Sequence, residues 1–174
     1  MAVITYREMA LAELPGRAPE IDVSEHGTVV YTWIEGELTA VPEAWDRPRW
    51  TAETWHQEKW STVLSLAGVR VWGAFHREQL VGLVVYRPHL TTGMAQLAAL
   101  FVSKDHRRQG IAARLTGEVA SQAKRDGHAR LYVSATPSES AVNFYQRQGF
   151  VPTQDANAEL YELEPEDIHM VKEL

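Results

Sequence analysis

The most distinctive feature of the hydrophobic pattern is an uninterrupted apolar run at residues 97–102, which predicts a buried strand over 94–102. A polar loop follows this strand. Apolar residues then recur every fourth position in a helix expected over 110–124, which Gly127 ends. A strand, a polar loop and an amphipathic helix in this order predict an α/β unit.

Other parts of the chain give shorter patterns of the same two kinds. One further helix is predicted over 138–148 and is stopped by Gly149. Strand patterns are found at residues 3–7, 69–75, 79–86, 131–134, 150–151 and 168–174. Together these elements predict an α/β arrangement around a mixed sheet, with no repeat and no linker.

The first 68 residues give the weakest pattern. A brief helix is expected over 8–14, interrupted by Pro15 and Gly16, and a β-hairpin over 28–34 and 37–41. After Pro42 we expect an irregular piece and then a helix over 51–67, with Thr51 as its N-cap. Near the other end of the chain, residues 157–167 are expected to form a loop.

Composition narrows the class of protein. The 174 residues fit one globular domain. The net charge of −6 disfavours a nucleic-acid partner, and the absence of cysteine removes disulfides and thiolate chemistry. No two of the seven histidines have the i, i+4 spacing of a helical metal pair, so no metal is expected. Without a signal-peptide pattern or a long apolar stretch, we expect a soluble, cytoplasmic protein with no membrane partner.

The loop after residue 102 has the chemistry of an anion site. It carries Lys104, His106, Arg107 and Arg108, and Gly110 stands where the next helix begins. The first backbone N–H groups of a helix lack carbonyl partners, and the helix dipole favours negative charge there. The pattern therefore predicts a phosphate-binding cradle.

Spacing decides between the known phosphate motifs. A dinucleotide fingerprint needs three glycines, whereas this loop has Gly110 alone, and a P-loop needs Gly-Lys-Ser or Gly-Lys-Thr, which the chain lacks. What the loop does contain is Arg107-Arg108-Gln109-Gly110-Ile111-Ala112, or R-x-x-G-x-A, at the start of a helix.

This motif resembles the signature of the GNAT superfamily of N-acetyltransferases. A second stretch is similar to another signature of that family: Leu131-Tyr132-Val133, Ser138, Ala141, Phe144, Tyr145 and Gly149-Phe150. The resemblance covers about residues 97–151. It implies a single domain over 1–174 with a mostly antiparallel twisted sheet flanked by helices. Residues 69–174 would be the acetyl-CoA-binding core, and residues 1–68 the region that varies with the acceptor.

The resemblance also assigns roles to residues. The pyrophosphate of acetyl-CoA would bind Arg107, Arg108, Gln109, Gly110, Ile111 and Ala112. The pantetheine arm would pair with Leu100, Phe101 and Val102. Ser138 replaces an asparagine that is frequent in the family and would cap its helix or reach the cofactor. Tyr145 would protonate the leaving CoA thiolate, unless it is a core residue.

The implied function is transfer of an acetyl group from acetyl-CoA to a primary amine by direct attack, without a metal. A catalytically silent CoA-binding or sensing domain on the same fold is the alternative. An RNA-binding module is a third reading, which the net charge disfavours. A homodimer is compatible with the sequence. The acceptor is not identified by any motif.

No motif in the sequence identifies the general base that would deprotonate the amine. The strand at 94–102 contains no carboxylate, so candidates have to come from elsewhere: His89, Glu37, Glu53, or a relay of water. An acidic run from Glu159 to Asp167 would attract a cationic acceptor, although such a run is typical of a solvated loop. The six tryptophans lie between Trp33 and Trp72 and are expected mainly in the core, with some available to line an acceptor pocket.

Overall fold

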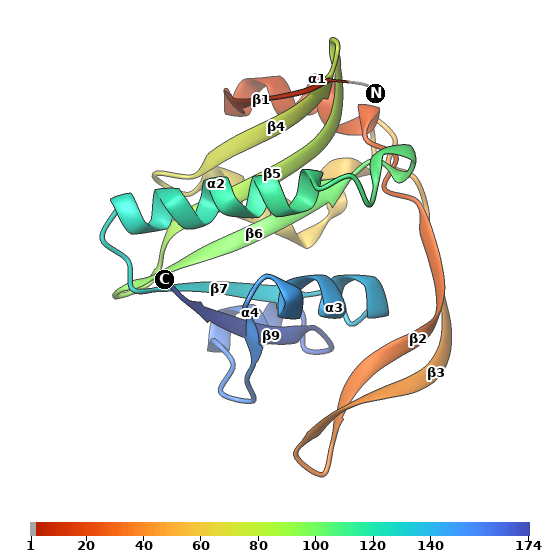
Figure 1. The fold of residues 1–174 in the computed structure, drawn as a ribbon, viewed down its shortest axis with the longest axis vertical. Helices are drawn as coiled ribbons and strands as arrows, with labels where there is room; N and C mark the ends of the chain where they lie inside the picture. The colour runs from red at the N-terminus through yellow and green to blue at the C-terminus, as the bar shows by residue number, and fades with distance from the viewer. Residues whose placement is uncertain (1–2) are drawn as a thin grey trace.

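The computed structural model describes residues 3–174 and has two sheets (Figure 1). The main sheet has the strand order β1-β4-β5-β6-β7-β9-β8, and its pairs are antiparallel except for β6 and β7. This confirms the predicted mixed, mostly antiparallel sheet. Its strands are β1 (Ile4–Met9), β4 (Arg70–His76), β5 (Gln79–Thr91), β6 (Met94–Val102), β7 (Arg130–Ala135), β8 (Val151–Pro152) and β9 (Ile168–Glu173).

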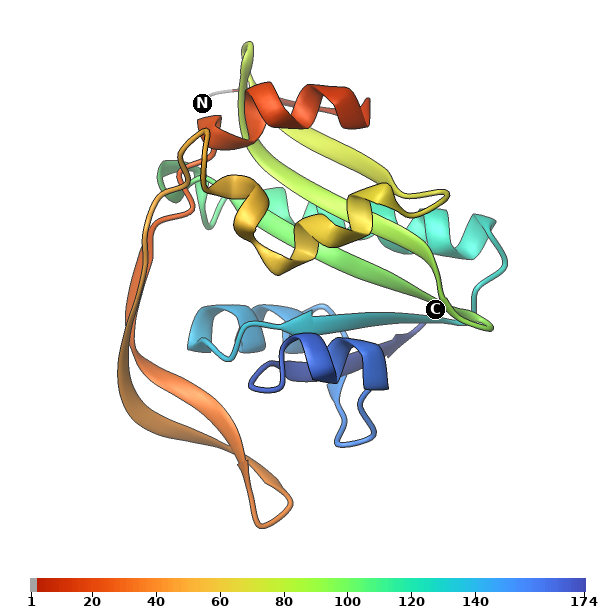
Figure 2. The ribbon, with the colours of Figure 1, turned by 180° about the vertical axis from the view of Figure 1, so that it is seen from behind.

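Helices cover both faces of this sheet. On one face lie α2 (Ile111–Arg125) and α3 (Glu139–Arg147), in the places where the sequence predicts helices. The opposite face, seen in Figure 2, carries the shorter helical segments. They are η1 (Leu11–Glu13), α1 (Leu14–Arg17), η2 (Ala18–Glu20), η3 (Trp55–Gln57), η4 (Lys59–Ser65) and α4 (Ala158–Leu163). No helix within residues 3–174 is both long and apolar enough to cross a membrane.

The hydrophobic stripe of α2 explains why this helix packs where it does. Ile111, Leu115, Val119 and Ala123 are all buried, and they share one core cluster with strand residues such as Val84. Residues at four-residue spacing lie on one helix face, so the whole stripe reaches the sheet at once. The strand-to-helix junction that carries the cradle is thereby fixed at the end of β6.

The helix predicted over 51–67 is wrong. The segment forms η3 and η4, two 3₁₀ helices separated by Glu58, whose backbone is extended at φ −61° and ψ 134°. Thr51 caps no α-helix: its backbone N–H donates to Thr54 Oγ1 at 2.8 Å. Burial of Trp50, Trp55 and Trp60 in one core cluster accounts for the broken helix, because three large rings on one short segment cannot share one regular helical face.

Three other local predictions are corrected. Residues 8–14 do not form one helix, since Glu8 belongs to β1 and Pro15 sits at the start of α1, where its missing N–H costs nothing. The piece after Pro42 is not irregular but continues as a strand. Residues 157–167 are not all loop, because Asn157 caps α4 by accepting a hydrogen bond from the Leu160 N–H at 3.1 Å.

The second sheet is a long hairpin of β2 (Glu25–Ile34) and β3 (Glu37–Arg47), which extends beyond the main body (Figures 1 and 2). The predicted hairpin is confirmed, but both of its strands are longer than expected. It meets the body beside α3, where the Tyr31 N–H donates to the Pro137 carbonyl at 2.7 Å. From its far strand, Arg47 reaches back and donates to Thr136 Oγ1 at 3.3 Å.

The one parallel pair of the sheet separates part-way along. β6 and β7 are paired from Met94 with Arg130 to Leu97 with Val133, and no farther, although both strands continue. Beyond Leu97, β6 remains paired with β5 on its other side. The backbone groups of β6 that face β7 therefore have no strand partner there, and a cleft opens between the two strands.

Candidate active site

The predicted cradle is a tight connection from β6 into α2. It contains a short 3₁₀ turn, η5 (Lys104–His106), and two residues with left-handed backbone, Arg108 at φ 60° and Gly110 at φ 81°. From Arg108 to Ala113, no backbone N–H donates a hydrogen bond within residues 3–174, and the first bond of the helix runs from the Arg114 N–H to the Gly110 carbonyl. Consecutive free N–H groups at a helix start form an anion site.

Gly110 suits this site for two reasons. Its φ of 81° is one that side chains other than glycine rarely tolerate. A Cβ added there would meet no protein atom within 4 Å, so the space above the free amides is open. A ligand anion can therefore approach the backbone directly.

The side chains of the cradle divide into structural and free ones. Arg107 is held in place, because its Nε donates to the Val102 carbonyl at 3.1 Å and its Nη2 to the Ser24 carbonyl at 3.2 Å. Gln109 donates to the Asp105 carbonyl at 3.3 Å. Arg108 is exposed and makes no such bond within the described chain. Arg107 and Gln109 thus shape the loop, whereas Arg108 is available to an anion.

A cavity in two adjoining parts leads from the cradle into the cleft between β6 and β7. Its outer part, about 190 Å³, contacts Val102, Arg107 and Ala112, and its inner part, about 150 Å³, reaches Leu97 and Val133. Both parts are lined by Leu100, Phe101, Thr136, Ala141 and Tyr145. The structure therefore brings the predicted strand residues, cradle residues and tyrosine to one cavity.

Tyr145 and Ser138 reach this cavity from α3. Tyr145 is 7% exposed, and its hydroxyl makes no hydrogen bond within residues 3–174. Burial, and the nearby charge of Asp167, raise the pKa of the Tyr145 hydroxyl above its usual range, so the group is protonated at neutral pH and can donate a proton. Ser138 is buried and caps α3 by accepting from the Ala141 N–H at 3.2 Å, while it also lines the outer cavity.

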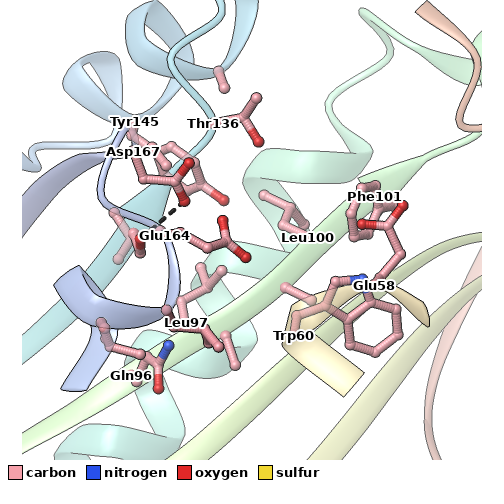
Figure 3. Close-up of a pocket in the computed structure, with 18 of the residues that line it drawn as sticks. Glu58, Trp60, Gln96, Leu97, Leu100, Phe101, Thr136, Tyr145, Glu164 and Asp167 are labelled. Carbon is pink, nitrogen blue, oxygen red and sulfur yellow. Dashed lines mark hydrogen bonds between the residues drawn. The ribbon is translucent and has the colours of Figure 1, made fainter. Parts of the chain in front are cut away.

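Three carboxylates line the inner cavity, and the sequence does not predict their meeting. Figure 3 shows Glu164 and Asp167 beside Tyr145, with Glu58 across the cavity next to Trp60. Glu164 and Asp167 come from the turn between α4 and β9, whereas Glu58 comes from the break between η3 and η4. The only available signal was the acidic run at 159–167, which alone does not indicate which of its members face inward.

Asp167 has the most perturbed carboxyl group of the site. Its Oδ2 accepts a hydrogen bond from Ser134 Oγ at 2.9 Å. Burial, together with a hydrogen bond to Glu164 and the charge of that neighbour, raises the pKa of the Asp167 carboxyl well above its usual range. Ser134 and the charge of Lys59 act in the opposite direction but do not compensate.

The inner cavity has a second mouth, lined mainly by residues 48–59 and by the turn at 164–167, on the side of the sheet that carries η3 and η4. This vestibule encloses about 920 Å³ and shares Glu58, Glu164 and Asp167 with the inner cavity. Lys59 links its two walls, because its Nζ donates to the Leu163 carbonyl at the end of α4 at 2.7 Å. The cleft therefore opens on both faces of the sheet, with free amides at one mouth and carboxylates at the other.

Comparison with known families agrees with this geometry. The family model of the acetyltransferase (GNAT) domain matches residues 38–174. The chain belongs to the GNAT family of acetyltransferases. The match includes β6, the cradle, α3 and the turn that carries Glu164 and Asp167, whereas Val23 and Glu25 of the outer cavity precede it.

Individual proteins show the same likeness. Human N-acetyltransferase 8 is 38% identical to this GNAT chain over 95 residues, which cover 52% of this chain and 42% of the human protein. The chain thus matches less than half the length of that relative. The crystal structure of nourseothricin acetyltransferase has a similar fold, with a TM-score of 0.71, 18% identity and 98% of both chains covered.

A second solved structure has a similar fold. A GNAT family acetyltransferase from Elizabethkingia anophelis, with acetyl-CoA bound, matches with a TM-score of 0.56 and 20% identity. The likeness covers 68% of this chain and 84% of that one. At this level of identity the two solved structures show that the GNAT fold is shared.

The structure does not bring the positions suggested from sequence for a general base to the cleft. His89, Glu37 and Glu53 line neither the inner cavity nor the vestibule. His89 packs instead against the ring of His128, with centroids 6.2 Å apart. Residues 3–174 contain no group of three His, Asp or Glu side chains placed to hold a metal ion.

Proposed function

We propose that this GNAT protein is an N-acetyltransferase, which transfers the acetyl group of acetyl-CoA to a primary amine by direct attack in a ternary complex. One observation carries the proposal: a single cleft opens on two faces of the sheet, with an anion cradle at one mouth, carboxylates at the other and Tyr145 between them. Two substrates can therefore meet without displacing one another.

On the cradle side, the pyrophosphate of acetyl-CoA would bind the free amides from Arg108 to Ala113, with Arg108 adding its charge. The pantetheine arm would lie along Leu100, Phe101 and Val102, where β6 has lost its partner β7. A bound acetyl-CoA in the Elizabethkingia relative supports this assignment.

At the centre, the thioester would lie against the unpaired backbone of β6. A backbone N–H that donates to the tetrahedral oxyanion is commonly worth about 3 kcal/mol of transition-state stabilisation. The protonated hydroxyl of Tyr145 would supply the proton that the departing thiolate takes up. Holding both reactants in one cleft supplies the remaining advantage through proximity.

The test measures binding and turnover separately. Calorimetric titration with acetyl-CoA measures the affinity, and thiol release from acetyl-CoA is followed with alkylamines, polyamines, amino acids and peptide N-termini as acceptors. We expect acetyl-CoA binding together with amine-dependent thiol release. Acetyl-CoA binding without turnover on any amine would contradict the proposal and favour the silent CoA-binding domain.

A further inference from the structure

The acceptor mouth of the cleft has a chemistry that the family motifs do not specify. Four of its six charged side chains are carboxylates: Glu58, Glu164, Glu166 and Asp167. Of its two basic residues, Lys59 is bonded to the Leu163 carbonyl and Arg49 lies 3.4 Å from Asp22. The local charge offered to a molecule in the vestibule is therefore negative.

Glu164 and Asp167 are also placed with respect to the chemistry. Both line the inner cavity together with Tyr145 (Figure 3). Tyr145 gives an independent sign of a ligand, because it is more than nine-tenths buried, points into this cavity and leaves its hydroxyl without a partner in the described chain. The hydroxyl is therefore free to form a hydrogen bond with a ligand in the cavity.

We propose that Asp167, paired with Glu164, binds the ammonium form of the acceptor and takes the proton that it must lose before attack. The acceptor is then a basic, cationic amine, and Asp167 is the general base that the strand at 94–102 does not supply. This inference rests on the proposed N-acetyltransferase function and deepens it. Ser134, which donates to Asp167 at 2.9 Å, is a positioning residue.

Asp167, Tyr145 and the two substrates account for every proton and bond of the transfer. Asp167 takes one proton from the ammonium, and the freed nitrogen lone pair attacks the thioester carbonyl carbon. A C–N bond forms, the C–S bond breaks, and the sulfur takes the proton of Tyr145. The new amide nitrogen returns its surplus proton to the tyrosinate, and the Asp167 proton leaves through the vestibule.

The raised pKa of Asp167 fits this role, because a carboxyl group with an ordinary pKa would be a weak base at neutral pH. An arriving ammonium favours the ionised carboxylates and is then itself deprotonated within the cavity. The charged and titratable groups that face Asp167 from the packed elements are Glu164, Tyr145, Glu58, Lys59 and Arg47.

The test compares two acceptors with the 174-residue chain and acetyl-CoA. Spermidine is an ammonium ion at pH 7.5, whereas methoxyamine is already neutral. We expect Asp167→Asn to lower kcat/KM for spermidine about 100-fold or more and for methoxyamine less than about tenfold, while the Kd for acetyl-CoA is unchanged. Glu162→Gln, which removes an exposed charge on α4 outside the cavity, is the matched control and should leave both values unchanged.

Two outcomes would overturn this inference and leave the proposed function standing. Either Asp167→Asn acetylates spermidine as fast as the wild type does, or Asp167→Asn loses the same factor in kcat/KM for both acceptors. A wild-type protein that binds acetyl-CoA but acetylates neither amine overturns the proposed function as well. The pH profile gives a second readout. For spermidine, kcat/KM should rise with pH as Asp167 ionises, and Ser134→Ala should move that limb to higher pH because the carboxylate loses a donor.

Discussion

The two mouths of the cleft are built in different ways. The cradle is one contiguous stretch in which a strand ends, a loop turns at Gly110 and a helix starts, and the groups it leaves free are chiefly backbone amides. The acceptor mouth is assembled from side chains far apart in the sequence, with Glu58 on one wall and Asp167 on the other. The first can be encoded by a short motif, whereas the second depends on how the whole chain folds.

The largest expected effect breaks the cradle and leaves the acceptor mouth intact. Gly110→Asp places a carboxylate among the free amides, in space that is open to a ligand, and should weaken acetyl-CoA binding about 100-fold or more. Calorimetric titration measures the Kd. Gly127→Asp, at the other end of α2, has nearly the same backbone strain at φ 82° and should bind normally, so equal losses in both variants would refute the cradle.

The second-largest effect is expected at Tyr145, which lines the cavity between the two mouths. Tyr145→Phe removes the proton donor and keeps the ring, and should lower kcat about 10- to 100-fold with little change in the Kd for acetyl-CoA. Single-turnover thiol release measures the chemical step. The exposed Tyr161→Phe provides the control. If Tyr145→Phe turns over at the wild-type rate, Tyr145 is a packing residue.

A smaller effect distinguishes backbone from side-chain recognition in the cradle. Arg108 is exposed and makes no bond within the described chain, so Arg108→Ala should raise the Kd for acetyl-CoA only about three- to tenfold. Because exposed charges are screened by salt, the difference from wild type should shrink as ionic strength rises. A loss as large as that of Gly110→Asp would mean that side-chain charge, rather than the amides, dominates binding.

The smallest effect concerns stability at the acceptor mouth. The pKa of the Asp167 carboxyl is higher in the folded protein than in the unfolded chain. At a pH between these two values the folded protein keeps a proton that the unfolded chain has lost, so the free energy of unfolding falls as pH rises above the ordinary range of aspartate. Asp167→Asn removes this cost while Ser134 can still donate to the amide oxygen. We expect the Tm at pH 8 to rise by about 2–4 °C, with little change at pH 4, in a thermal melt followed by circular dichroism. A lower Tm at pH 8 would contradict the buried-carboxylate argument.

The same contrast explains what the sequence could predict. The apolar run before the cradle, the stripe of α2 and the residues from Ser138 to Phe150 are local patterns, and the structure brings the residues they single out to one cavity. The helix expected over 51–67 was wrong because tertiary burial of three tryptophans overrides helix propensity. Glu164 and Asp167 could not be distinguished from their acidic neighbours, because their inward position depends on the fold of α4, which Asn157 caps and Lys59 ties to the body.

The early separation of β6 from β7 leaves an edge strand inside the molecule instead of at its rim. An exposed edge invites pairing with any other chain, whereas this one is screened by helices on both faces. Only a slender, extended molecule bearing its own amide groups can reach it and complete the missing ladder. In the proposed binding mode the pantetheine arm pairs with this edge as a further strand would, so the protein should discriminate against thioesters whose carrier lacks such amides, even when their acyl group is the same.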